Sequence, residues 1–342
     1  WVGHYRGGLG YVAVFAAIIM ASLSGSAVAD TAALASILIP MMRAAGYDVS
    51  RSSGLIAAGG IIAPIIPPSI GFILFGVAAN VSITKLFLAG IVPGIMMGIA
   101  IGIAWYIVAK KEKVQPSPKV PMRERLLVTW QGGLALLLPI VIIGGMKTGM
   151  FTPTEAAVVA AVYAFIVGKF IYGELQWKSL FGLFLAAGKT TSVVMFLVAA
   201  AMVSAWLITI ANIPKEVAEM FAPIMDKPML LMFAMMVLIV IVGTALDFAP
   251  TVLILTPVLV PVVVQAGIDP VYFGVLFIMN NAIGLITPPV GTVLNVVSGV
   301  ARITMDQAFR GVMPFLIAQL VVLFTLVAFP QLVLTPLKWW LR

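Results

Sequence analysis

The sequence predicts an all-α polytopic membrane protein built from two inverted repeats. Hydrophobic residues make up 62% of the 342 residues and charged residues 9%, whereas a soluble domain has roughly 45–50% and 25%. Apolar stretches close to the ~20 residues that cross a bilayer recur along the chain. One arrangement of small, polar and proline residues also occurs twice. Together these observations favour repeats that each carry a re-entrant helical hairpin and a transmembrane helix broken at a Pro-Pro pair.

The duplication consists of seven residues that recur at a constant offset of 221 positions, the separation of Pro67 from Pro288. In the first half they are Pro40, Gly46, Asp48, Pro67, Pro68, Gly90 and Pro93, and in the second half Pro261, Gly267, Asp269, Pro288, Pro289, Gly311 and Pro314. Paired apolar segments that are interrupted at corresponding places are typical of secondary transporters, whose site lies where the repeats meet.

The first repeat is expected over residues 1–109. A hairpin is predicted at 10–45, because two apolar half-helices flank a small polar tip. A helix at 54–80 should unwind at its Pro-Pro pair, since proline removes a backbone donor and clashes with the preceding turn. A further apolar helix covers 86–109. Such irregular backbone persists at membrane depth only where protein or a water-filled cavity surrounds it, so we expect the hairpins to face the broken helices.

A basic, proline-containing linker at 110–125 is expected to join the halves. The second repeat, at 126–342, is expected to hold helices at 126–147, 152–172 and 188–212, a hairpin at 228–265, a broken helix at 271–300 and a helix at 311–332. The three helices before the second hairpin have no counterpart in the first half. We therefore expect further spans upstream of residue 1.

The basic residues indicate the orientation. If each hairpin turns back and every other segment crosses, one side of the membrane receives the linker and Arg6, Arg43, Arg51, Lys169, Lys178, Lys189, Arg302 and Arg310. The opposite side receives Lys85, Lys147 and the stretch 214–228, in which acidic residues offset the basic ones. The positive-inside rule makes the first side cytoplasmic. The first hairpin then opens to the cytoplasm and the second to the outside, which makes the repeats inverted.

The composition argues against several classes of function. The chain has no cysteine and one histidine, His4, so we expect neither disulfides nor a metal site with His or Cys ligands. The formal net charge of +8 does not indicate nucleic-acid binding, since the basic residues fall in short loops that orient membrane proteins.

Three carboxylates lie at membrane depth, where ionisable side chains are functional candidates. Glu155 belongs to TPTEAA, in which Thr152 and Glu155 predict a capping box, so we interpret it as structural. Asp30 and Asp247 lie at the hairpin tips. Each either caps a helix N-terminus or helps to hold a cation or to shape the substrate site.

Hydroxyl groups gather beside both breaks, at Ser24, Ser26, Ser69, Thr244, Thr251 and Thr287. In membrane helices such groups often bond their own backbone, but here they could equally join unwound carbonyls as oxygen ligands of a cation. Half-helix N-termini at the tips suit an anionic substrate. Because no arginine is expected in the core, we favour sodium plus helix dipoles over a basic site, with Asn295 as a further residue facing it.

A resemblance to a known family rests on five motifs in order: SGSAVADTAALASILIPMM, APIIPPSIGFILFGV, NVSITKLFLAGIVPG, TPTEAAVVAAVYA and ITPPVGTVLNV. They resemble the large membrane subunit of tripartite ATP-independent periplasmic (TRAP) transporters along essentially the whole chain. The stretch GLIAAGGIIAPIIPPSIGFILFGVAANVSITKLF is most similar to the sialic-acid members. The resemblance implies sodium-coupled import of sialic acid (N-acetylneuraminate), or alternatively of a C4-dicarboxylate or another organic acid, across the bacterial inner membrane by an elevator-type motion.

The resemblance also implies partners and sites. The partners are a small four-helix membrane subunit, separate or fused, and a periplasmic substrate-binding protein, besides membrane lipids. One sodium site maps onto Ser24, Gly25, Ser26, Pro67, Pro68 and Ser69, and another onto Gly243, Thr244, Asp247, Thr287, Pro288, Pro289 and Gly291. We place the substrate at Ser24, Asp30, Thr31, Asp247, Thr251 and Asn295. Two or more Na+ ions and no organic cofactor are expected.

Two other classes of protein share part of this pattern. An ion channel would use similar re-entrant segments, but channel filters usually come from symmetric oligomers, whereas here one chain supplies both inverted halves. An intramembrane protease would need catalytic groups, and the sequence has no HExxH, GxSxG or GxGD motif. Only Asp30 and Asp247 could meet as paired carboxylates. The expected protein is a secondary active transporter and not an enzyme.

Overall fold

The protein is helical throughout the part that its computed structural model describes, residues 1–111 and 119–341. These residues form α-helices with one π-helical and one 3₁₀ turn, and no β-strand occurs among them. Eight of the described helices are long and apolar enough to cross a membrane. The prediction of an all-α polytopic membrane protein is confirmed.

Five helices make up the first half: α1 (Gly8–Ser24), α2 (Ala27–Ala44), α3 (Val49–Gly60), α4 (Ile70–Ala79) and α5 (Ile83–Lys111). α1 and α2 occupy the place of the expected hairpin. α3 and α4 are the two parts of the expected broken helix, which is interrupted over residues 61–69. Of the expected linker, residues 112–118 lie outside the described residues.

Four helices and two turns follow before the second hairpin begins: α6 (Met122–Lys147), α7 (Pro153–Ile166), the π-helical turn η1 (Val167–Ile171), α8 (Trp177–Ile210), α9 (Ile213–Phe221) and the 3₁₀ turn η2 (Ala222–Ile224). α8 begins at Trp177 rather than at residue 188, so Lys178 and Lys189 are helical and not in a loop. A helix of 34 residues is ~50 Å long. Because the helix is longer than the ~30 Å hydrocarbon core, a lysine can lie in the part of the helix that extends outside the core.

The second half continues with α10 (Pro228–Ala245), α11 (Phe248–Gln265), α12 (Pro270–Gly284), α13 (Thr292–Ala301), α14 (Met305–Ala328) and α15 (Gln331–Trp340). α14 begins earlier than the helix expected at 311–332, because Thr304 and Gln307 form a capping box at its start, and it ends earlier as well, at Ala328. The sequence did not predict α9 or α15. α10 to α14 repeat the order of α1 to α5, and the Pro67-Pro68 and Pro288-Pro289 peptide bonds in the two breaks are both cis.

The turns after the two hairpins use the same two residue types. Gly46 and Gly267 have φ angles of 79° and 71°, in the left-handed region that glycine adopts without steric cost. Asp48 and Asp269 then cap α3 and α12, each accepting a backbone hydrogen bond of 2.7 Å. The duplicated Gly and Asp residues therefore end each hairpin and begin each broken helix.

α3 and α12 lie at the centre of the molecule. Residues 271–284 of α12 are all buried, as are residues 52–60 of α3. Small residues let helix backbones approach closely: α14 packs on α3 at Gly311 and Gly54, and α10 packs on α12 at Gly243 and Gly284. α2 also packs against α13, and α11 against α4, so each hairpin contacts the broken helix of the other half.

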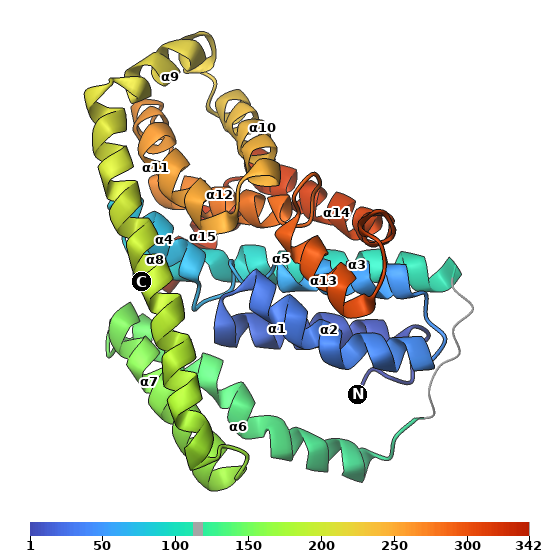
Figure 1. The fold of residues 1–342 in the computed structure, drawn as a ribbon. Helices are drawn as coiled ribbons and strands as arrows, with labels where there is room; N and C mark the ends of the chain where they lie inside the picture. Colours follow the sequence, from blue (N-terminus) through green and yellow to red (C-terminus); the bar gives the residue numbers. More distant parts are fainter. Residues whose placement is uncertain (112–118, 342) are drawn as a thin grey trace.

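α6, α7 and α8 lie along the outside of this central bundle (Figure 1). No residue of α8 is buried, and only Ala156 of α7 is. α8 contacts the centre mainly through α11. The structure therefore separates a tightly packed set of hairpins and broken helices from a more exposed peripheral set.

Candidate ion and substrate site

The tip of the first hairpin lies directly against the break in the helix that follows it. Gly25 ends α1 with a φ angle of 66°, in the left-handed region. A Cβ atom on Gly25 would lie 2.6 Å from the carbonyl oxygen of Pro68. Both the backbone angle and the close approach therefore require glycine. The structure brings together Ser24–Ser26 and Pro67–Ser69, the two segments that were grouped from the sequence.

Two serines and an aspartate form a chain of hydrogen bonds within this tip. Ser24 donates from Oγ to Oδ1 of Asp30 and accepts from the backbone N–H of Ser26 at 3.1 Å. Ser26 caps α2 by accepting from the N–H of Ala29 at 3.4 Å. Asp30 lies one turn further along, so its interpretation as an N-cap is wrong. It is 1% exposed, and its Oδ2 has no hydrogen-bond partner among the described residues.

Thr31 and Ser69 are the other fully buried hydroxyls of this junction. Thr31 faces α3 so closely that a Cβ on Gly60 would overlap its hydroxyl, and Thr31 Oγ1 has no partner in the described part of the chain. Ser69 caps α4, accepting from the N–H of Phe72 at 3.1 Å and donating to the carbonyl of Pro64 at 2.5 Å. Ser69 therefore holds the broken backbone in shape, whereas Thr31 keeps its hydrogen-bonding capacity.

The second hairpin contacts its own break through backbone groups. The N–H of Val290 donates to the carbonyl of Thr244 at 3.2 Å. A Cβ on Gly284 would lie 2.7 Å from the backbone of Gly243. Gly291, with a φ angle of 49°, begins α13 after the break. Here too the structure brings a hairpin tip and a Pro-Pro break together.

Three threonine hydroxyls of this junction donate to backbone carbonyls close by in the sequence. Thr244, Thr251 and Thr287 donate to carbonyls three or four residues earlier, at 2.8, 2.8 and 2.9 Å. This is the backbone bonding that is common in membrane helices. A hydroxyl that donates in this way still has oxygen lone pairs with which it can contact a cation.

Asp247 and Asn295 lie at the exposed edge of the second junction. Asp247 precedes α11 at the N-cap position, but its side chain makes no capping hydrogen bond. Asn295 donates from Nδ2 to the carbonyl of Val290 at 2.8 Å and so supports the backbone of the break. Asp30 is buried and bonded to Ser24, so Asp30 and Asp247 have different surroundings, which does not favour a protease dyad.

Asn280 and Asn281 are buried polar residues of α12 that the sequence analysis did not identify. Asn280 donates to the carbonyl of Met236 at 2.6 Å, and Asn281 to the carbonyl of Phe248 at 2.9 Å. The Oδ1 atoms of both amides lack a partner among the described residues. Because buried polar atoms are nearly always paired, an unpaired amide oxygen beside a hairpin tip is a candidate ligand. The sequence feature that could have identified these residues is a pair of adjacent amide side chains within an apolar span.

Glu155 lies outside the site. The N–H of Thr152 donates to Oε2 of Glu155 at 2.8 Å, and the N–H of Glu155 donates to Oγ1 of Thr152 at 3.3 Å. This reciprocal pair is the capping box at the start of α7, so the structural interpretation of Glu155 is confirmed.

Four helices begin at the tips and breaks, namely α2, α4, α11 and α13. A Cβ on Gly71, in the first turn of α4, would lie 2.7 Å from the ring of Phe248, the first residue of α11. The N-termini of α4 and α11 are therefore close together although they belong to different halves. Helix N-termini carry partial positive charge and free N–H groups. The arrangement is chemically suited to an anion beside oxygen-lined cation sites.

The chain matches the family model described as "Tripartite ATP-independent periplasmic transporter, DctM component" over residues 1–332. It is 57% identical over 338 residues to the 2,3-diketo-L-gulonate TRAP transporter large permease protein YiaN of Escherichia coli (strain K12), a match that covers 99% of this chain and 80% of the relative. It is 39% identical over 333 residues to the sialic acid TRAP transporter large permease protein SiaM of Vibrio cholerae, with 97% of this chain and 78% of the relative covered.

A third relative is the C4-dicarboxylate TRAP transporter large permease protein DctM of Pseudomonas aeruginosa. It is 37% identical over 338 residues, and the match covers 99% of this chain and 79% of that protein. The family match extends over nearly the whole chain, and the described helices include eight that can cross a membrane. The chain belongs to the DctM family of large TRAP transporter permeases, which are multi-pass proteins of the bacterial inner membrane.

Proposed function

We propose that this permease imports an organic anion together with sodium ions, by an elevator-type movement of its hairpins and broken helices. The observation that carries the proposal is the doubled junction, in which a hairpin tip packs against a Pro-Pro break in each half of the chain. Each junction supplies carbonyls and hydroxyls where helices are interrupted, and such sites bind coupling ions in transporters built from repeats.

The first sodium ion is placed at Ser24, Gly25 and Ser26 with the Pro67-Pro68-Ser69 break. The unpaired oxygens of Asp30 and Thr31 lie just beyond this tip. A buried carboxylate oxygen with no donor is energetically costly unless a cation or proton balances it. A cation near Asp30 would remove that cost.

The second sodium ion is placed between residues 243–247 and 287–291. Oδ1 of Asn281 adds an unpaired oxygen to this junction, 3.2 Å from the position that a Cβ of Gly243 would occupy. Threonine hydroxyls line the same segments. An amide oxygen and backbone carbonyls are the neutral ligands that a monovalent cation tolerates at membrane depth.

The substrate is proposed to be a small carboxylate, of which 2,3-diketo-L-gulonate is now preferred to sialic acid. The relative named for diketogulonate is 57% identical to this chain, whereas those named for sialic acid and C4-dicarboxylates are 39% and 37% identical. All three named substrates are carboxylates, which suits the helix N-termini at the junctions. Ser24, Asp30, Thr31, Asp247, Thr251 and Asn295 remain the proposed substrate residues.

The inverted topology is supported by contacts between segments that were assigned to one side of the membrane. Lys147 Nζ, on the assigned outer side, lies 5.4 and 4.8 Å from the ring centroids of Trp339 and Trp340, which follow the last expected crossing at 311–332. Arg43 donates to the carbonyl of Ala301 at 2.7 Å on the assigned cytoplasmic side. The exposed α6 to α8 are proposed as the scaffold along which the central bundle moves.

The proposed partners are a small membrane subunit and a periplasmic substrate-binding protein, in line with the word tripartite in the family description. α8 has no buried residue and α6 has few, so both present apolar surface to lipid or to another membrane subunit. A chain that exposes two such helices has room for a helical partner.

Uptake into proteoliposomes tests the proposal. The permease is reconstituted with its membrane subunit and binding protein, and labelled 2,3-diketo-L-gulonate, N-acetylneuraminate or a C4-dicarboxylate is supplied with or without an inward sodium gradient. Saturable, gradient-dependent uptake and counterflow of diketogulonate are expected. Uptake that does not depend on the sodium gradient, or non-saturable flux without counterflow, would contradict a sodium-coupled carrier.

A further inference from the structure

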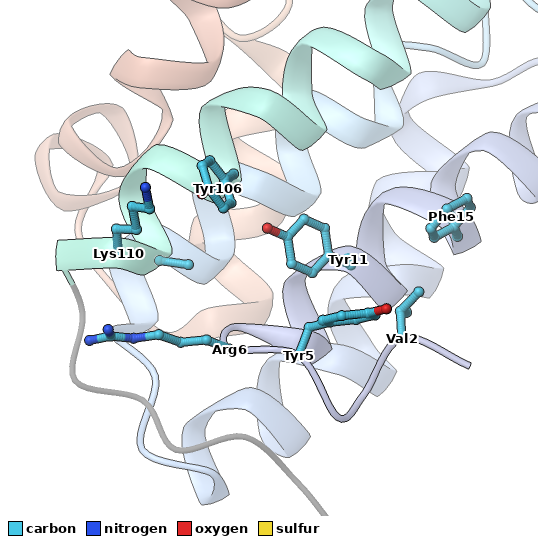
Figure 2. Close-up of a pocket in the computed structure, with 8 residues that line it drawn as sticks. Val2, Tyr5, Arg6, Tyr11, Phe15, Tyr106 and Lys110 are labelled. Atoms are coloured by element: carbon cyan, nitrogen blue, oxygen red, sulfur yellow. The ribbon is translucent and has the colours of Figure 1, made fainter. Parts of the chain in front are cut away.

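A cavity lies away from the hairpin tips, between the start of α1 and the end of α5. It has a volume of about 540 Å³, and its lining includes Tyr5, Arg6, Tyr11, Phe15, Tyr106 and Lys110. Figure 2 shows Arg6 and Lys110 at one end, Phe15 at the other and the three tyrosines between them. Ligand pockets commonly have volumes of ~300–1,000 Å³, so this cavity is large enough for a small ligand or a lipid headgroup.

The basic end of the cavity suits an anion. Lys110 Nζ lies 4.5 Å from the ring centroid of Tyr106, so the ammonium group sits over this ring. Arg6, which also has another interaction within the protein, adds a second cation, and no acidic side chain is among the described residues that line the cavity. Tyrosine hydroxyls can donate to phosphate or glycerol oxygens. Basic pockets between helices at the cytoplasmic surface bind lipid headgroups by this combination of charges and donors.

Exposed apolar residues of α1 and α5, here called the apolar track, continue beyond the cavity along these two helices. Tyr11, Phe15 and Ile19 share one face of α1 because they are four residues apart. Phe15 is 55% exposed and Ile99 of α5 is 57% exposed. A Cβ on Gly102 of α5 would meet no atom within 4 Å, so no other described residue covers this position.

The length of the track matches one leaflet. Lys110 and Ile99 both lie on α5, and at 1.5 Å per residue they are ~16 Å apart along the helix. The hydrocarbon core is ~30 Å thick, so the track extends about as far as an acyl chain reaches in a single leaflet. A soluble phosphate compound would leave this apolar surface unused.

We propose that this cavity binds an anionic glycerophospholipid of the cytoplasmic leaflet. The phosphate lies between Arg6 and Lys110, the glycerol region contacts Tyr11 and Tyr106, and one acyl chain follows α1 and α5 past Phe15. The orientation rests on the topology proposed above, but binding itself is independent of sodium coupling and of the transported substrate.

Native mass spectrometry of the assembled transporter, released from nanodiscs that contain phosphatidylcholine and phosphatidylglycerol, tests the proposal. The wild-type protein should retain phosphatidylglycerol in preference to phosphatidylcholine. A basic residue near the membrane surface strengthens binding of anionic lipid about 5-fold, so Lys110→Gln should weaken it about 5-fold and Arg6→Gln/Lys110→Gln about 30-fold. Lys110→Arg, which keeps the charge, should restore retention.

The matched control is Lys215→Gln/Lys338→Gln, which removes two charges from α9 and α15 and should leave retention unchanged. Because loss of Arg6 could also disturb the fold, Lys110→Gln alone with its Lys110→Arg rescue is the decisive pair. Equal retention of both lipids, unchanged retention in Lys110→Gln, or displacement of phosphatidylglycerol by millimolar inorganic phosphate would overturn the proposal. The last result would indicate a soluble phosphate ligand instead.

Discussion

Asn281 donates a hydrogen bond from Nδ2 to the carbonyl oxygen of Phe248 at 2.9 Å, which ties the last turn of α12 to the first turn of α11. Its other amide atom, Oδ1, faces Gly243 of α10. One fully buried side chain therefore contacts both arms of the second hairpin. Because the hairpin also packs on α12 through Gly243 and Gly284, the tip is held at a fixed position relative to the central helix.

Replacing Asn281 with alanine is expected to destabilise the permease. The substitution removes the buried amide that donates to the part-buried Phe248 carbonyl, which costs about 1–3 kcal/mol. The measurement is the unfolding midpoint in detergent relative to the wild type. Asn295→Ala is the control, because it removes a bond of 2.8 Å from an exposed side chain and water can replace the lost partner. Equal losses in the two variants would contradict the anchoring role of Asn281.

Gly284→Ala is expected to separate α10 from α12. The added methyl group would lie 2.7 Å from the backbone of Gly243, so the hairpin must shift. Overpacking of this kind costs about 1–3 kcal/mol, measurable as a lower unfolding midpoint and weaker transport. Gly299→Ala is the matched control, since a Cβ there meets no atom within 4 Å, and in a helix interior it should stabilise by about 0.5–1 kcal/mol. Equal behaviour of the two alanine variants would mean that this close approach is unimportant.

The inverted topology predicts where single cysteines react. The chain contains no native cysteine, so Lys119→Cys and Glu219→Cys each introduce one exposed thiol. A membrane-impermeant maleimide should label Lys119→Cys only from the cytoplasmic side and Glu219→Cys only from outside. Labelling of both positions from one side would show that an odd number of crossings has been misassigned between them.

The hairpins and breaks could be predicted closely because their boundaries are set by local chemistry. Gly46 and Asp48 turn and cap the chain as Gly267 and Asp269 do, and each Pro-Pro pair interrupts a helix. α8 was less predictable. Lys178 and Lys189 suggested a loop, but an exposed helix of 34 residues tolerates both.

The candidate site was only partly predictable from the duplication. Repeat symmetry identifies residues that have a similar counterpart in the other half. Asn280 and Asn281 have none, because they correspond to Gly59 and Gly60 in the first half. In the first half a hairpin threonine, Thr31, faces Gly60, whereas in the second half Asn281 on the helix faces the hairpin. The polar side chain at the contact between hairpin and broken helix therefore comes from the hairpin in the first half and from the broken helix in the second. Only the packing in three dimensions reveals this exchange.

The central claim is that sodium binds at the two junctions between hairpin tip and broken helix. The most direct measurement is the sodium concentration that gives half-maximal uptake in the assembled transporter. Ser26→Ala and Asp247→Asn should each raise it by an amount equivalent to about 1–3 kcal/mol, the scale of a lost bond to a charged group. Glu155→Gln keeps the capping box of α7 and should leave the sodium dependence nearly unchanged. Loss of sodium coupling in Glu155→Gln, with normal coupling in Ser26→Ala and Asp247→Asn, would place the ion sites in a different part of the chain.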